Sequence, residues 1–123
     1  SKVLRKTIPG IAIIATEPDN SPILSKGVAC KHRIMGTAPG FIPDTLDQYS
    51  YDDIIPINAD QAIATSRQLA EREGIFCGIS CGAAVAGMIT HASKEAARDA
   101  ELLAILPDTG ERYLSTELWS SPI

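Results

Sequence analysis

Short apolar runs are spaced along this chain and separated by amphipathic or irregular stretches. The run from Ile11 to Thr16 is almost entirely apolar, which is typical of a strand buried on both faces of a parallel sheet. The run from Asp53 to Ile57 predicts a shorter strand, and its Pro56 indicates a sheet edge or a strand end. A further apolar run, Leu102 to Leu106, predicts another buried strand.

A helix is predicted after the second strand. Asn58 or Asp60 can cap its N-terminus, and it is expected to run to about Glu73. Gly74 stands where a left-handed residue commonly ends a helix. The apolar and small residues of this stretch share one helical face: Ala62, Ile63, Ser66, Leu69 and Ala70.

Other segments complete the α/β pattern. Residues 1–6 resemble the last turns of a helix, and small apolar residues from Gly82 to about His91 predict a closely packed helix that residues 93–100 extend or follow. Residues 25–52 have no clear periodicity and predict a long functional loop. The order of strands and helices predicts an α/β fold, with a mainly parallel sheet and flanking helices.

Composition limits the class of protein. The 123 residues suffice for one small domain, and the net charge of −4 argues against nucleic acid or an anionic membrane as a partner. No apolar run approaches the roughly 20 residues that cross a bilayer. The odd count of three cysteines suggests reduced thiols and a cytoplasmic location.

The most informative motif is the turn from Gly78 to Ala84. A glycine-flanked turn at a helix start exposes backbone N–H groups, and Ser80 would present a hydroxyl there to a polar ligand. Alternatively, Ser80 is an N-cap that satisfies the next helix. Cys77 and Cys81 lack further ligands at metal-binding spacing, so no metal site is predicted and both are expected to be inert.

Two other segments carry candidate chemistry. The turn that begins at Pro107 and Asp108 follows a predicted strand, and ligands of parallel sheets bind at the carboxyl ends of strands. A charged surface loop with a Glu111–Arg112 pair is the alternative. His32, in the long loop, could be an acid, a base or a ligand, although a lone loop histidine is more often solvated.

Read together, four segments resemble the cysteine synthases (O-acetylserine sulfhydrylases), which are fold-type II pyridoxal-phosphate enzymes. The resemblance covers nearly the whole chain and matches the C-terminal portion of the family. The segments are Glu17-Pro18-Asp19-Asn20-Ser21-Pro22, Lys31-His32-Arg33-Ile34-Met35-Gly36 with Gly40-Phe41-Ile42-Pro43, Gly74 to Ala84, and Leu106 to Thr116.

The resemblance implies a cofactor site and a mobile loop. In the family, the serine matching Ser80 hydrogen-bonds the pyridine nitrogen of pyridoxal 5'-phosphate, and Pro107 and Asp108 match residues flanking that ring edge. A neutral hydroxyl leaves the ring a weaker electron sink, which favours β-elimination. Gly36, Thr37 and Ala38 match the loop that closes over the substrate.

The resemblance also implies an activity. The family makes L-cysteine from O-acetylserine and sulfide, as a homodimer, and some members bind serine acetyltransferase. Residues 1–123 would form the C-terminal part of the catalytic fold, within its larger domain. The Schiff-base lysine would lie upstream, so no catalytic residue is assigned here and these residues alone are expected to be inactive.

One local departure bears on the substrate. The family usually has Gln-Gly-Ile-Gly-Ala-Gly where this chain has Met35 to Gly40, and Ala38 and Pro39 restrict a loop that should move. A cystathionine β-synthase-like enzyme, an enzyme that takes sulfur from a carrier protein, and a non-catalytic homologue that binds serine acetyltransferase are the alternatives. An upstream targeting segment would alter the expected cytoplasmic location.

Overall fold

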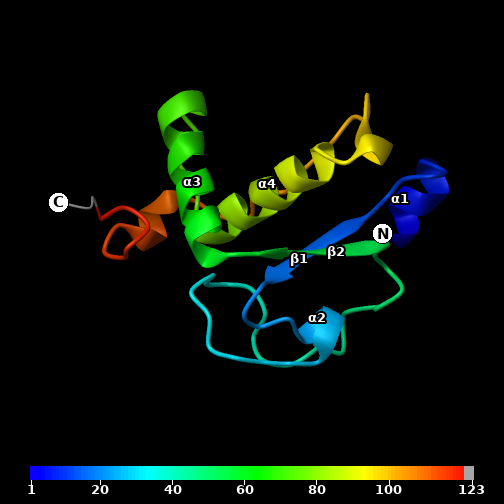
Figure 1. Cartoon of the computed structure of the whole chain (residues 1–123), viewed down its shortest axis with the longest axis horizontal. Helices are drawn as coiled ribbons and strands as arrows, with labels where there is room; N and C mark the ends of the chain where they lie inside the picture. Colours follow the sequence, from blue (N-terminus) through cyan, green and yellow to red (C-terminus); the bar gives the residue numbers. More distant parts are fainter. Residues whose placement is uncertain (121–123) are drawn as a thin grey trace.

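A two-stranded parallel sheet lies at the centre of the computed structural model, which describes residues 1–120. Strand β1 spans Ile14–Pro18 and strand β2 spans Asp53–Ile57. Ile14 lies opposite Asp53 and Pro18 opposite Ile57, so both strands end at the same edge of the sheet (Figure 1). The bounds predicted for the second strand are confirmed.

The first strand differs from its predicted form. It begins at Ile14 instead of Ile11, because backbone pairing with β2 starts there and continues through Glu17 and Pro18. Only those last two residues are buried, so the expected burial on both faces is wrong for the described chain. The apolar pattern located the strand, but pairing with β2 determined its ends.

Helices α3 (Ala59–Glu73) and α4 (Ile79–Ala92) pack against each other, and α4 lies along one face of the sheet (Figure 1). The predicted caps of α3 are confirmed: the Asn58 side chain accepts a hydrogen bond of 2.8 Å from the backbone N–H of Asp60, and Gly74 is left-handed, with φ 69°.

The α3–α4 contact depends on small residues. A Cβ added at Gly82 would lie 2.1 Å from the carbonyl oxygen of Ala62 and 2.2 Å from Ser66 Oγ. Ser66 is fully buried and donates a hydrogen bond of 2.9 Å to the carbonyl of Gly78. This confirms the predicted close packing, and it connects α3 to the turn that precedes α4.

The remaining elements are short. They are α1 (Lys2–Thr7), α2 (Ile23–Lys26) and two 3₁₀ helices, η1 (Glu95–Ala97) and η2 (Gly110–Tyr113). The predicted long loop is confirmed between Lys26 and Asp53, and with α2 it lies on the side of the sheet opposite α4 (Figure 1). Through Ser120, no helix is long and apolar enough to cross a bilayer.

The predicted strand from Leu102 to Leu106 does not form. The segment pairs with no strand among residues 1–120, and exposed residues alternate with half-buried ones along it. Leu103 is 86% exposed and Ile105 is 75% exposed. The apolar residues of this segment are therefore not buried by any other part of the described chain. A strand forms only where a partner strand accepts its backbone hydrogen bonds, and the described chain offers none here.

We expect these 123 residues, expressed alone, to unfold without a sharp cooperative transition and to bind a hydrophobic dye. A thermal melt followed by circular dichroism, with dye fluorescence, checks this. Replacing Leu103 and Ile105 by threonine should reduce dye binding here. In a longer protein that buries both, each replacement should cost about 1.5–3 kcal/mol of stability. A sharp melt of the isolated chain would contradict the expectation.

Candidate functional site

Ser80 lies in the first turn of α4. The helix begins at Ile79 with Gly78 as its N-cap, one turn earlier than predicted, because the backbone of Gly78 is extended (φ −78°, ψ 174°) and its carbonyl accepts the first helical hydrogen bonds. Ser80 is therefore no N-cap, and that alternative is wrong. Its half-buried hydroxyl makes no hydrogen bond to another described residue, which leaves it available to a ligand.

The structure brings the two predicted site turns together. Cys77 pairs with Thr109 in an antiparallel bridge, and the N–H of Gly110 donates a hydrogen bond of 3.1 Å to the carbonyl of Phe76. A Cβ added at Gly78 would lie 2.3 Å from Oδ1 of Asp108. The Asp108 side chain therefore packs against the backbone just before Ser80, and only glycine leaves room for it.

Asp108 accepts hydrogen bonds at both carboxylate oxygens. The thiol of Cys81 donates to Oδ1 at 3.3 Å, and the phenol of Tyr113 donates to Oδ2. This hydrogen bond, followed by partial burial, raises the pKa of Tyr113 to about 12. Because both oxygens of Asp108 have partners within the chain, the carboxylate is better suited to holding the turn than to moving protons.

Both thiols beside Ser80 are buried and unbridged, with 2% exposure at Cys77 and none at Cys81. Burial, then the neighbouring Cys81, raises the pKa of Cys77 to about 11. A thiol with a raised pKa carries little thiolate and is a poor nucleophile. The predicted burial of both cysteines is confirmed, and their inertness stays a prediction.

An aromatic contact supports the outer side of the Pro107 turn. The rings of Phe76 and Trp119 lie 4.6 Å apart between centroids, and Trp119 Nε1 donates a hydrogen bond of 3.0 Å to the carbonyl of Gly110. Pro107 itself is exposed, and no ion pair joins Glu111 to Arg112 in the described part of the chain. The turn is thus held by aromatic packing and by the hydrogen bonds of Asp108 and Trp119, not by the charge pair considered as the alternative.

The predicted substrate loop is a separate feature. Gly36, Thr37 and Ala38 make no hydrogen bond to the Ser80 turn among residues 1–120. The loop is connected to that turn through Ile34, which is 1% exposed and lies in the same hydrophobic cluster as Ile79. The structure therefore places the loop on the core that supports Ser80.

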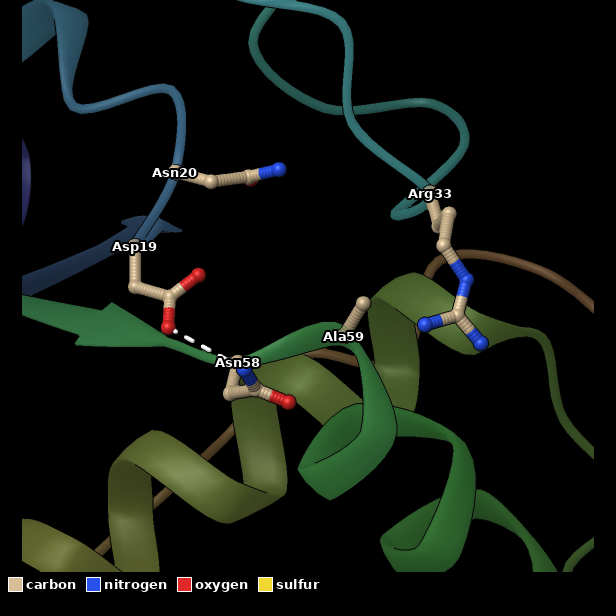
Figure 2. Close-up of a pocket in the computed structure, with 5 residues that line it drawn as sticks. All are labelled: Asp19, Asn20, Arg33, Asn58 and Ala59. Carbon is tan, nitrogen blue, oxygen red and sulfur yellow. Dashed lines mark hydrogen bonds between the residues drawn. The ribbon is translucent and has the colours of Figure 1, made fainter.

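An open polar pocket of about 310 Å³ lies where β1 and β2 end (Figure 2). Asn58 Nδ2 donates a hydrogen bond of 3.2 Å to Asp19 Oδ2, and the Arg33 side chain extends from the long loop toward the start of α3 (Figure 2). The residues that line the pocket are Asp19, Asn20, Arg33, Asn58 and Ala59. Sequence reasoning missed it, although Asp19 and Asn58 directly follow parallel strands, which is the signal for such a site.

Arg33 ties the long loop to the rest of the molecule. It donates hydrogen bonds of 2.8 and 2.7 Å to Glu117 and one of 2.8 Å to Asp60 in the first turn of α3. The hydrogen bonds from Arg33 lower the pKa of the Glu117 carboxyl. Arg33 and Glu117 are about half exposed and Asp60 is 77% exposed, so the ion pairs position the loop more than they stabilise the fold.

None of the lysines occupies a site suited to covalent catalysis. All five are exposed, and Lys94 is ion-paired with Asp53 at 2.9 Å. A Schiff-base lysine is activated by removal from water or by a neighbouring cation, and neither applies here. Among residues 1–120, no group of three or more histidine, cysteine or acidic side chains is placed to hold a metal ion.

The fold and the paired turns define a piece of an α/β enzyme, and comparison with known proteins identifies the family. A family model described as "Pyridoxal-phosphate dependent enzyme" matches residues 1–108. The chain therefore belongs to the pyridoxal-phosphate-dependent enzymes, and its predicted place among the fold-type II members, with its α/β fold, is confirmed.

The chain is similar to a cysteine synthase of Staphylococcus aureus, with 47% identity over 119 residues, 97% of this chain and 38% of that protein. It is 46% identical over 118 residues to the O-ureido-L-serine synthase of Streptomyces lavendulae, covering 96% of this chain and 36% of that protein. The crystal structure of O-acetylserine sulfhydrylase isoform 3 from Entamoeba histolytica matches with a TM-score of 0.94 at 35% identity, over 99% of this chain and 36% of that chain. The chain thus spans little more than a third of the length of these proteins.

We expect the Asp108–Tyr113 hydrogen bond to make stability depend on alkaline pH. The raised pKa means that the folded state holds the phenolic proton more tightly than the unfolded state. This stabilisation is complete below pH about 10 and is lost as the pH rises toward 12. The difference in tyrosinate absorbance between the wild type and Tyr113→Phe isolates this phenol. A difference titration centred near 10 would contradict the contact.

Proposed function

We propose that this chain is part of a cysteine synthase that makes L-cysteine from O-acetylserine and sulfide by β-elimination and β-replacement. The observation that carries the proposal is the meeting of the Ser80 turn with the Pro107–Asp108 turn, which leaves one neutral hydroxyl free beside a buried support. Similarity to cysteine synthases over 97% of the chain supports it. The homologous proteins are longer, so the activity belongs to the protein as a whole.

Ser80, Pro107 and Asp108 are the residues that we propose to hold the cofactor. The free hydroxyl of Ser80 fits the pyridine nitrogen of pyridoxal phosphate, and Gly78 leaves room for Asp108 beside the turn that carries Ser80. The cofactor supplies an electron sink for β-elimination. Asp108, held by Cys81 and Tyr113, fixes the turn that flanks Ser80.

The remaining parts of the reaction lie outside these residues. The exposed lysines fit no Schiff base, so we propose that the catalytic lysine belongs to a preceding part of the protein and that residues 1–123 are the C-terminal part of the catalytic fold. The uncovered apolar face at Leu103 and Ile105 supports this, because added strands would bury it. A homodimer, with serine acetyltransferase as a possible partner, completes the proposal.

We propose that Gly36, Thr37 and Ala38 contact the substrate. The loop stands on Ile34, close to the core that supports Ser80, and exposed Met35 and Phe41 flank it. An exposed loop on a rigid support can close over a ligand and exclude water. The polar pocket at Asp19 and Asn58 lies where β1 and β2 end, and it would add polar groups to the substrate site.

The second substrate is the open part of the proposal. Identity to the O-ureido-L-serine synthase is 46% and to the cysteine synthase 47%, so overall similarity does not separate the two nucleophiles. The two names state different products, cysteine and O-ureido-L-serine, which differ in the group carried on the β-carbon. A cystathionine β-synthase-like reaction, which needs homocysteine, and transfer of sulfur from a carrier protein remain further alternatives.

The test is a comparison of nucleophiles on the full-length, cofactor-loaded protein. We expect O-acetylserine to change the visible absorption of the bound cofactor, and sulfide to restore it with release of cysteine. Hydroxyurea or homocysteine in place of sulfide should react at least tenfold more slowly. Faster reaction with either would assign that product instead. An unchanged spectrum together with binding of serine acetyltransferase would identify a non-catalytic homologue.

We expect Ser80→Ala to weaken cofactor binding about 2- to 10-fold, the value of one net hydrogen bond, and to shift its visible absorption. Titration of the apoprotein with pyridoxal phosphate measures both. Ser93→Ala, which removes the hydroxyl at the other end of α4, is the matched control and should leave both unchanged. Equal behaviour of the two variants would remove Ser80 from the cofactor site.

A further inference from the structure

Ala38 has a backbone conformation that alanine rarely adopts. Its φ is 40°, in the left-handed region, where a Cβ atom crowds the following carbonyl. The next residue is Pro39, which restricts the residue before it to extended conformations. Two independent steric effects therefore oppose this geometry. Such strain persists only where surrounding contacts enforce it, and it concentrates at functional sites.

One histidine makes the contact that enforces it. Nε2 of His32 lies 2.9 Å from the carbonyl oxygen of Ala38. A carbonyl only accepts hydrogen bonds, so Nε2 carries a proton and donates it to Ala38. The other ring nitrogen, Nδ1, is buried and has no partner among the described residues, so the bond to Ala38 is the one hydrogen bond that the ring makes there.

Little else holds the loop from Met35 to Gly40, called here the 35–40 loop. Gly36 and Gly40 have φ of 83° and 92° with open space around them, and Met35 is 43% exposed. Thr37 Oγ1 donates a hydrogen bond of 2.8 Å to the carbonyl of Ile34, which fixes only the start of the loop. The His32–Ala38 bond is therefore the described side-chain contact that determines the second half.

We propose that His32 is a positioning residue, which preorganises the 35–40 loop for the amino-acid substrate by holding Ala38 in its left-handed conformation. This inference rests on the proposed function only in assigning the loop to the substrate. Alanine populates this left-handed conformation roughly 5- to 30-fold less than glycine does, and the hydrogen bond from His32 offsets that loss. A loop so held needs less ordering when substrate binds, which favours a low KM.

Backbone dynamics tests the bond in the full-length, cofactor-loaded protein. In His32→Ala, the amide order parameters of Thr37, Ala38 and Gly40, measured by NMR relaxation, should fall from the value of about 0.85 that is typical of rigid backbone to below about 0.6. His32→Gln, whose side-chain amide can reach the same carbonyl, should restore the wild-type order parameters. His91→Ala is the matched control, because His91 also has a buried, unpartnered Nδ1 but lies in the last turn of α4. Unchanged order parameters in His32→Ala would overturn the proposal.

Steady-state kinetics separates positioning from a purely structural role. We expect His32→Ala to raise KM for O-acetylserine about 2- to 10-fold, with kcat and the absorption of the bound cofactor nearly unchanged. Adding Ala38→Gly should recover most of the KM, because glycine adopts the turn without support. A KM that stays at the wild-type value while the order parameters of the loop fall would overturn the positioning role. A wild type without turnover would refute the proposed function instead, and the order parameters would still show whether His32 holds the loop.

Discussion

The close approach of α3 and α4 is the contact on which the rest of the site depends. With no side chain at Gly82, the carbonyl of Ala62 and the hydroxyl of Ser66 come within the space that a Cβ would fill. Ser66 uses this closeness to donate its hydrogen bond to the carbonyl of Gly78. The start of α4, and with it Ser80, is thereby fixed by a buried contact and not by a surface cap.

A second support reaches the same turn from the other side. Gly78 leaves room for Asp108, and Asp108 is held by Cys81 from α4 and by Tyr113 from η2. Segments separated along the chain thus converge on one turn without using the Ser80 hydroxyl. A group that is rigidly held and has an unused polar atom is suited to binding, because little conformational entropy is lost when a ligand arrives.

The sequence predicted best those features that depend on local chemistry. The bounds of α3 follow from the Asn58 cap and the left-handed Gly74, and both act within a few residues. The start of α4 was placed too late, because Gly78 caps it through backbone conformation alone and leaves no side-chain signal. The strand from Leu102 to Leu106 was predicted from an unbroken apolar run, but a strand also needs a partner, which residues 1–120 do not supply.

In the candidate site, too, the features that depend on local sequence were predicted, and those that depend on tertiary packing were not. The Ser80 and Asp108 turns could be named from their glycines and their place after apolar runs, but their contact depends on tertiary packing that no short motif encodes. The polar pocket was missed because Asp19 and Asn58 lie far apart in the chain and meet only through the parallel register of β1 and β2. Register is set by how the whole sheet is covered, so its consequences appear only when the helices are in place.

In the 35–40 loop, Ala38 occupies a left-handed position that would usually be taken by glycine. Glycine would adopt the Ala38 conformation without strain, yet a glycine-rich segment would also sample many other conformations and lose more entropy on ordering. Alanine followed by proline limits those alternatives, provided that one contact compensates the strain. His32 supplies that contact from the segment just before the 35–40 loop, so this hydrogen bond is made without a group from the sheet or from α4. The segment can therefore be ordered at its tip while its flanks, Met35 and Phe41, remain exposed to whatever the completed protein places opposite them.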